Sequence, residues 1–185
     1  MKNTALLIID VQNDYFTGGK MALPAAEAAS QNISAILKGF REKKLPVIHI
    51  QHESVKEGST FFLPNTDGQK IHDSVAPLDN EIIISKNFPN SFLQTELQTQ
   101  LQQLNIRRLV ITGMMTFMCV DATTREAKDL GYECILAHDC TATPPIEFGG
   151  TSCSDMQAKA VIVAALSFIC DRVASVPEIL ETLEG

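Results

Sequence analysis

The sequence lacks an apolar run long enough to cross a membrane. Its best candidate, AVIVAALSFIC from Ala160, falls short of the about 20 residues that a spanning helix needs. The N-terminal segment also lacks the long apolar region and the cleavage site of a signal peptide. The formal net charge is −7 with dispersed acidic residues, so DNA and anionic membrane surfaces are repelled on average. We therefore expect a soluble, cytoplasmic protein that binds neither nucleic acid nor membranes.

Paired metal-binding motifs are also missing. The five cysteines form no Cys-x-x-Cys pair and have no histidine at zinc-finger spacing, which argues against a structural zinc site. The first apolar run is followed by DVQNDYFTGG rather than by a Gly-x-Gly-x-x-Gly turn, so a nucleotide site is poorly supported. With 45% hydrophobic and 20% charged residues, the composition is that of an ordinary globular protein. We expect a single domain over residues 1–185.

Strand-like and helical patterns alternate along the whole chain. The apolar runs predict six strands, at 5–10, 47–51, 81–85, 108–113, 133–137 and 170–175. Helical spacing predicts helices at 25–44, 92–105 (capped by Ser91), 119–130, 154–168 and after Ser175. Continuously apolar strands joined by helices indicate a sheet covered on both faces. The predicted fold is a three-layer α/β/α sandwich with a six-stranded, mostly parallel sheet.

Polar residues follow several of these strands. In open α/β sheets, binding sites form outside the carboxyl ends of the strands. Five positions are therefore expected on one rim: Asp10, His52, Lys86, the segment from Gly113 to Cys119, and Asp139.

Three of these residues together suggest an activated nucleophile. Cys119, at a helix start, would have its pKa lowered by the free amides and the helix dipole, although a buried, inert thiol is the common alternative. Asp10 follows five apolar residues, where it either pairs with a cation or caps the next turn. Lys86 ends the third strand and is either part of a site or an exposed surface lysine. A thiol, a carboxylate and an ammonium on neighbouring strand ends can perform nucleophilic catalysis without histidine.

Three segments carry a resemblance to a known family. LLIIDVQNDYF, SKNFPNSF and ITGMMTFMCVDATTREAKDLGY are similar to the signature segments of the isochorismatase-like cysteine hydrolases, which include nicotinamidases and N-carbamoylsarcosine amidases. The resemblance covers nearly the whole chain and implies a Rossmann-like topology. It also implies a catalytic triad of Asp10, Lys86 and Cys119, a cis peptide bond at Met114-Met115, and an oxyanion hole formed by the backbone N–H groups of Met115 and Cys119.

The sequence departs from the family pattern at two points. Nicotinamidases resemble one another in an Asp-x-His metal motif after the second strand, whereas this chain has His52 and Ser54 in those positions. We therefore expect no metal and no cofactor. Enzymes that act on isochorismate generally lack the nucleophilic cysteine, so Cys119 favours an amide-like substrate over a vinyl ether.

The substrate pocket is predicted from aromatic residues and one histidine on segments that reach the rim. Core packing is the alternative for each of them: Phe16, His52, Phe61, Phe62, Phe92 and Phe117. The loop 139–153 is long for a compact α/β protein and is expected to act as a lid or a subunit contact. Relatives are usually homo-oligomers, and Met114, Met118 and Phe148 are candidates for a contact within a dimer or tetramer.

The resulting functional hypothesis is a cysteine-dependent hydrolase for a small molecule. It would cleave a C–N bond of an amide, ureido or lactam group through a thioester. The alternatives are a vinyl ether hydrolase, a non-catalytic binding protein, and a redox sensor that uses Cys119 or Cys140 with a resolving thiol.

Overall fold

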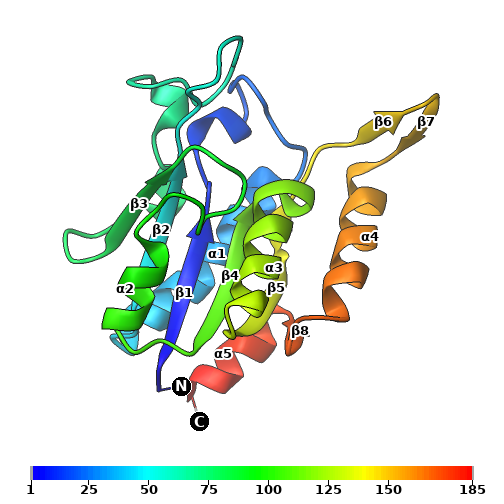
Figure 1. Ribbon diagram of the computed structural model, residues 1–185. Helices are drawn as coiled ribbons and strands as arrows, with labels where there is room; N and C mark the ends of the chain where they lie inside the picture. Colours follow the sequence, from blue (N-terminus) through cyan, green and yellow to red (C-terminus); the bar gives the residue numbers. More distant parts are fainter. Residues whose placement is uncertain (1, 185) are drawn as a thin grey trace.

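The computed structural model describes residues 2–184, and a six-stranded parallel sheet forms its centre (Figure 1). The strands are β1 (Thr4–Ile9), β2 (Val47–His52), β3 (Ile82–Lys86), β4 (Arg108–Met114), β5 (Glu133–Ala142) and β8 (Arg172–Ala174). Their order is β3-β2-β1-β4-β5-β8, and every neighbouring pair is parallel. The predicted sheet is confirmed.

Helices cover both faces of this sheet, as the three-layer prediction requires. On one face pack α1 (Ala26–Glu42) and α5 (Val176–Glu184), and on the other α2 (Leu97–Gln103), α3 (Asp121–Asp129) and α4 (Asp155–Ser167). The alternation of side chains along each strand gives each face its own apolar core. In β1, for example, Leu6 and Ile8 face α1, whereas Leu7 and Ile9 face the opposite layer.

Two predicted helix boundaries differ from the structure. The helix expected over 92–105 spans only Leu97–Gln103, because the Ser91 hydroxyl lies 2.8 Å from Thr123 Oγ1 instead of capping a helix. Gln94, with a φ of 56°, then interrupts helical geometry. The helix expected from Cys119 begins earlier, with the π-helical turn η4 (Thr116–Val120) that runs directly into α3.

The segment 139–153 is more regular than a loop. β5 continues to Ala142, because Thr141 and Ala142 pair with Gly113 and Met114 after a register shift. The antiparallel strands β6 (Ile146–Phe148) and β7 (Thr151–Cys153) follow. This hairpin and α4 form an arm that projects from the sheet (Figure 1). We refer to residues 146–167 as the arm.

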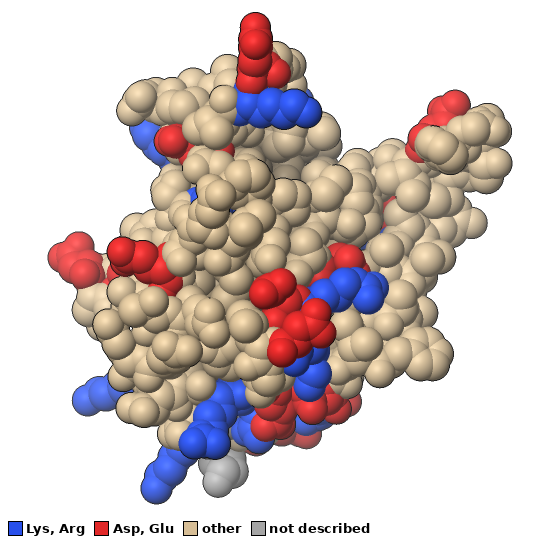
Figure 2. All heavy atoms as spheres, viewed as in Figure 1, with Lys and Arg blue, Asp and Glu red and all other residues tan. Residues whose placement is uncertain are grey.

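The arm carries few charges and exposes apolar side chains. In the view of Figure 2 its surface is almost entirely uncharged apart from acidic atoms near the hairpin tip. Phe148 is 92% exposed and Met118, on η4, is 42% exposed. Met114 is fully buried, so its expected part in a subunit contact is wrong. Among the described residues, no helix is long and apolar enough to cross a membrane.

Candidate active site

Asp10 is placed by the end of the central strand β1. Its amide donates a hydrogen bond to Ile50 O on β2 at 3.0 Å, and its φ of 51° turns the chain into the left-handed region directly after the strand. Aspartate enters this region more readily than most residues. The side chain is fully buried, so a carboxylate is held without water at the carboxyl end of the sheet.

Lys86 and His52 are neighbours on β3 and β2. They are register partners in the parallel pair, and their side chains lie on the same face of the sheet. Lys86 Nζ lies 2.7 Å from Asp10 Oδ2, 3.1 Å from His52 Nδ1 and 3.0 Å from Phe88 O. An ammonium has three hydrogens to donate, so Lys86 can join groups from several segments.

Cys119 lies in the π-helical turn η4, opposite these groups. π-helical turns are rare and frequent at functional sites. The Cys119 residue is only 5% exposed, and the candidate ligand atoms of Asp10, His52 and Cys119 all lie within 4.8 Å of one another. Four segments that are distant in sequence therefore bring a carboxylate, an imidazole, an ammonium and a thiol together.

The thiol in this cluster is not activated in the way the sequence suggested. Burial raises the pKa of Cys119 most, and the Asp10 charge raises it further, while Lys86 opposes both. The expectation that a helix terminus lowers this pKa is therefore wrong. Burial alone would lower the pKa of Lys86, but Asp10 and Cys119 outweigh it, and the net shift is upward. The two shifts favour the ammonium form of Lys86 and the neutral thiol of Cys119.

A small apolar cavity of about 180 Å³ opens onto the sulfur. Its walls are Tyr15, His52, Phe61, Phe62, Pro89, Met115, Met118 and Cys119. The aromatic part is tightly associated, since Tyr15 and Phe62 meet edge to face with ring centroids 4.7 Å apart. His52 also contacts Phe62, at a centroid separation of 5.9 Å. The cavity fits a small, flat, largely apolar molecule.

The structure places half of the predicted pocket residues elsewhere. His52, Phe61 and Phe62 line the cavity. Phe16 instead stacks on His72 at 3.5 Å between ring centroids, Phe92 lies beside Tyr132, and Phe117 packs against the core on the α1 face. All three follow the alternative of core packing.

Sequence reasoning missed several wall residues. Tyr15, Pro89 and Met118 lie within a few positions of Asp10, Lys86 and Cys119. Their short distance in sequence from the predicted catalytic residues could have identified them as wall residues. Asp139, which was expected on the rim, lies in the irregular part of β5, where its Oδ2 accepts a hydrogen bond from Val176 N at 3.0 Å.

Two buried polar residues hold the walls of the cavity in place. Gln12 accepts from His52 N at 2.7 Å and donates to His52 O at 2.9 Å, which fixes the backbone of that residue. Asp14 accepts from Phe62 N at 2.6 Å and so supports Phe62 in its left-handed conformation, with a φ of 54°. The residues that shape the cavity are thus held by hydrogen bonds outside it.

The turn between β4 and η4 brings the backbone close to the cluster. The peptide bond between Met114 and Met115 is cis. Just before it, Gly113 has a φ of +121°, and a Cβ at this position would lie 2.0 Å from Ile9 O. Only glycine permits so close an approach of β4 to β1 beside Asp10.

A metal ion fits the cluster poorly. Asp10, His52 and Cys119 offer suitable ligand atoms. However, Lys86 Nζ already contacts Asp10 Oδ2 at 2.7 Å and His52 Nδ1 at 3.1 Å, so a cation would be bound against an existing positive charge. The absence of a metal, which was inferred from His52 and Ser54, stays a prediction.

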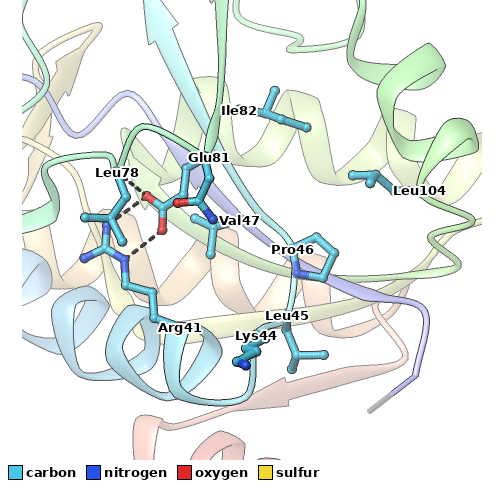
Figure 3. Close-up of a pocket in the computed structure, with 10 residues that line it drawn as sticks. Arg41, Lys44, Leu45, Pro46, Val47, Leu78, Glu81, Ile82 and Leu104 are labelled. Atoms are coloured by element: carbon cyan, nitrogen blue, oxygen red, sulfur yellow. Dashed lines mark hydrogen bonds and ion pairs between the residues drawn. The ribbon is translucent and has the colours of Figure 1, made fainter.

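A larger cavity of about 440 Å³ lies at the other end of β2 and β3 (Figure 3). Its walls include Arg41, Val47, Glu81, Ile82 and Leu104. Glu81 is held there by Arg41 and by the backbone of Leu78, and the walls of the cavity contain no cysteine, serine or threonine. The reactive groups of the described chain gather at the smaller cavity.

Comparisons with known proteins agree with this geometry. Residues 4–167 match the family model of the isochorismatase domain. The chain is 48% identical over 144 residues to the isochorismatase family protein YddQ of Bacillus subtilis. The alignment covers 78% of this chain and 80% of YddQ. It is 27% identical to the ureidoacrylate amidohydrolase RutB of Cronobacter sakazakii, over 78% of this chain and 77% of RutB.

A solved structure shows the same architecture. The crystal structure of an isochorismatase hydrolase from Oleispira antarctica superposes with a TM-score of 0.93 at 46% sequence identity, and the match covers 97% of both chains. The shared fold therefore extends over nearly the whole chain, including the segments that carry Asp10, Lys86 and Cys119.

Proposed function

The chain belongs to the isochorismatase family of hydrolases, and from this premise we propose that it is a cysteine-dependent amidohydrolase. Its substrate would be a small molecule with an amide, ureido or lactam C–N bond. The observation that carries the proposal is the buried cluster in which Asp10, Lys86 and Cys119 meet at the end of an apolar cavity. A buried carboxylate beside a thiol and a cation is an arrangement that can activate the thiol as a nucleophile.

The first half of the reaction forms a thioester. The Asp10 carboxylate accepts the thiol proton as the Cys119 sulfur attacks the substrate carbonyl, forming a C–S bond. The tetrahedral intermediate then breaks its C–N bond, and Asp10 returns the proton to the departing amine. Because the pKa of the Cys119 thiol is raised, deprotonation is coupled to attack rather than completed beforehand.

The second half regenerates the enzyme. Asp10 accepts a proton from water, whose oxygen attacks the thioester carbonyl. The C–S bond then breaks to release a carboxylic acid, and Asp10 returns the proton to the sulfur, which restores both the thiol and the carboxylate. Lys86 keeps its proton throughout and offsets the negative charge that moves between Asp10 and Cys119.

Backbone amides would stabilise the oxyanion of both tetrahedral intermediates. The candidates are the N–H groups of Met115, directly after the cis peptide bond, and of Cys119. Losing one such donor costs about 3–4 kcal/mol of barrier in comparable sites. Preorganised donors are most effective in a cavity as apolar as this one.

The relatives and the buried thiol favour a C–N bond over the alternatives. RutB, by its name, is an amidohydrolase. A vinyl ether hydrolase has no use for a nucleophilic sulfur at the end of the cavity. A redox sensor needs a resolving thiol, but Cys140 packs in the core on the α1 face, whereas Cys119 belongs to the opposite core.

The decisive experiment detects the covalent intermediate. The protein is incubated with a panel of primary amides, ureides and lactams. Ammonia release is measured for the amides and ureides and ring opening by chromatography for the lactams, and acid-quenched samples are analysed by intact-mass and peptide mass spectrometry. We expect an acyl adduct on the peptide that contains Cys119 for compounds whose thioester is hydrolysed more slowly than it forms. Equal turnover by Cys119→Ala, or an adduct on another residue, would refute the mechanism.

We also propose that two copies associate through the arm. Within one chain α4 buries only Ala158 and Leu166, although its sequence is largely apolar, and a helix that is apolar on all sides belongs in an interior. The exposed side is nearly free of charge, so two copies can pack it against itself about a twofold axis (Figure 2). Analytical ultracentrifugation should show a dimer or tetramer, with Val161→Asp shifted to monomer. A monomeric wild-type protein at tens of micromolar would overturn the proposal.

A further inference from the structure

The imidazole of His52 is a directional hydrogen-bond donor on the wall of the cavity, which also includes the phenol of Tyr15. Lys86 Nζ lies 3.1 Å from His52 Nδ1, and a protonated amine can only donate. Nδ1 must therefore accept, and the ring proton resides on Nε2. Burial first, and then the charge of Lys86, lower the pKa of His52 against the pull of Asp10, in keeping with a neutral ring. The contact with Lys86 thus selects one tautomer.

The imidazole of His52 is placed where it can contact an occupant of the cavity. The ring forms part of the cavity wall, and its backbone is clamped on both sides by Gln12. Within residues 2–184 no side chain or carbonyl takes the Nε2 proton. The surrounding walls are the rings of Tyr15, Phe61 and Phe62 and the apolar side chains of Pro89, Met115 and Met118. A donor in such surroundings favours a ligand that brings an acceptor.

The same cluster offers nothing to an anionic substrate. Lys86 Nζ already contacts Asp10 Oδ2, His52 Nδ1 and Phe88 O, and the wall of the cavity contains neither lysine nor arginine. The buried Asp10 carboxylate adds a negative charge close to the sulfur. A second carboxylate in the cavity would be desolvated without a partner, which is strongly unfavourable.

We propose that His52 Nε2–H selects the substrate by donating a hydrogen bond to it, and that the substrate class is uncharged amides or ureides whose apolar part carries one hydrogen-bond acceptor. The proposal rests on the proposed function, because it assigns the cavity as the substrate site. It adds a specificity residue and excludes ureido acids and other anionic amides.

A binding experiment tests His52 without requiring turnover. The rate of Cys119 alkylation by iodoacetamide is followed by peptide mass spectrometry in the presence of benzamide or one of the three pyridinecarboxamide isomers. These compounds share one shape, and the isomers move a single acceptor around the ring. We expect at least one isomer to protect Cys119 at about tenfold lower concentration than benzamide, because an unpaired buried donor weakens binding by roughly this factor or more.

Two substitutions of His52 separate the donor from the shape of the ring. In the His52→Phe variant, benzamide and the best isomer should protect Cys119 equally well. The His52→Gln variant keeps an N–H donor and should retain part of the preference for that isomer. His72→Phe is the matched control, because His72 stacks on Phe16 outside the cavity and should keep the wild-type preference. Equal protection by all four compounds in the wild type, or an undiminished preference in His52→Phe, would overturn the assignment.

A pair of alkylating agents tests the exclusion of anions. Iodoacetate and iodoacetamide differ in charge but little in size, and their rate ratio with glutathione gives the intrinsic difference. We expect Cys119 to discriminate against iodoacetate at least tenfold more than glutathione does, and an equal ratio would refute the exclusion. Neither assay depends on hydrolysis, so a failure of the amidohydrolase mechanism would appear separately, as equal turnover by Cys119→Ala or an adduct on another residue.

Discussion

A carboxylate lies beside each end of strand β3, and the two carboxylates differ in how many hydrogen bonds they accept. At the amino end, both oxygens of Glu81 are satisfied: Arg41 donates from Nε at 2.7 Å and from Nη2 at 2.8 Å, and Leu78 N donates at 2.9 Å (Figure 3). At the carboxyl end, Asp10 has its ion pair with Lys86 at 2.7 Å, and its Oδ1 lacks a well-aligned hydrogen bond in the described chain. A saturated carboxylate stabilises the fold, whereas an unsaturated one beside a thiol can accept a proton.

The comparison also shows that the size of a cavity does not identify the reactive end. The cavity beside Glu81 measures about 440 Å³ and the one beside Cys119 about 180 Å³. Histidines are present at both ends, but His49 Nε2 lies 3.0 Å from Glu81, whereas His52 faces a cavity. The hydrogen-bond partners of each polar group are therefore more informative than the empty space next to it.

The largest effect should come from removing the sulfur at the carboxyl end. Cys119→Ala should lower kcat by at least about a thousandfold, because no other group can form the covalent intermediate. Ammonia release from the best compound of the panel measures this. The matched control is Cys140→Ala, a buried thiol in the opposite core, which should keep kcat within about twofold. Equal losses in the two variants would mean that the thiol at the cluster has no special role.

Removing either charge of the Asp10–Lys86 ion pair should lower stability as well as activity. Asp10→Asn or Lys86→Met leaves the other group buried without its partner, which costs about 3–5 kcal/mol. The double variant removes both charges and should recover much of that stability, while activity stays absent. Urea unfolding and ammonia release measure the two properties. A double variant no more stable than either single one would show that the pair is not coupled.

A substitution of Glu81, at the amino end of β3, should change the stability of the protein but not its activity. Glu81→Gln weakens charge-assisted hydrogen bonds with Arg41 and His49 and should cost about 1.5–3 kcal/mol of unfolding free energy. We expect kcat/KM to stay within about twofold, because Glu81 lies at the far end of the strand from Cys119. A tenfold loss of kcat/KM with unchanged KM would show that the two ends are functionally connected.

Much of the fold was predictable because the strands are buried on both faces. Runs such as ALLIID and RLVITG are continuously apolar, so their type and order could be inferred, and strand ends then located Asp10, Lys86 and Cys119. Helix boundaries were less predictable, since they depend on distant contacts. The helix expected from residue 92 begins at Leu97, because Ser91 bonds to Thr123 on α3.

The chemistry of the cluster was less predictable than its members. The pKa of Cys119 depends on how deeply the sulfur is buried and on how near Asp10 lies, and the helical pattern after residue 119 reveals neither. Phe61 and Phe62 reach the cavity because Asp14, distant in sequence, holds the backbone of Phe62. Phe16 directly follows the wall residue Tyr15 in sequence, but its ring stacks on His72 outside the cavity.

The smallest expected effect is a dependence of stability on pH that arises at the amino end. Burial would raise the pKa of Glu81, but hydrogen bonds from Arg41, Leu78 and His49 outweigh it and lower this pKa from 4.5 to about 2. A carboxyl group with a lowered pKa stabilises the folded state fully above its unfolded pKa and loses that contribution as pH falls. The difference in unfolding free energy between wild type and Glu81→Gln should therefore be constant from pH 8 to about 5 and shrink between about pH 4.5 and 2.

Burial also lowers the pKa of His49, so the wild type should begin to lose stability below about pH 6.5, before Glu81 titrates. Urea unfolding curves at half-unit pH intervals measure both phases, and a difference that stays constant down to pH 3 would show that Arg41 does not hold Glu81 ionised.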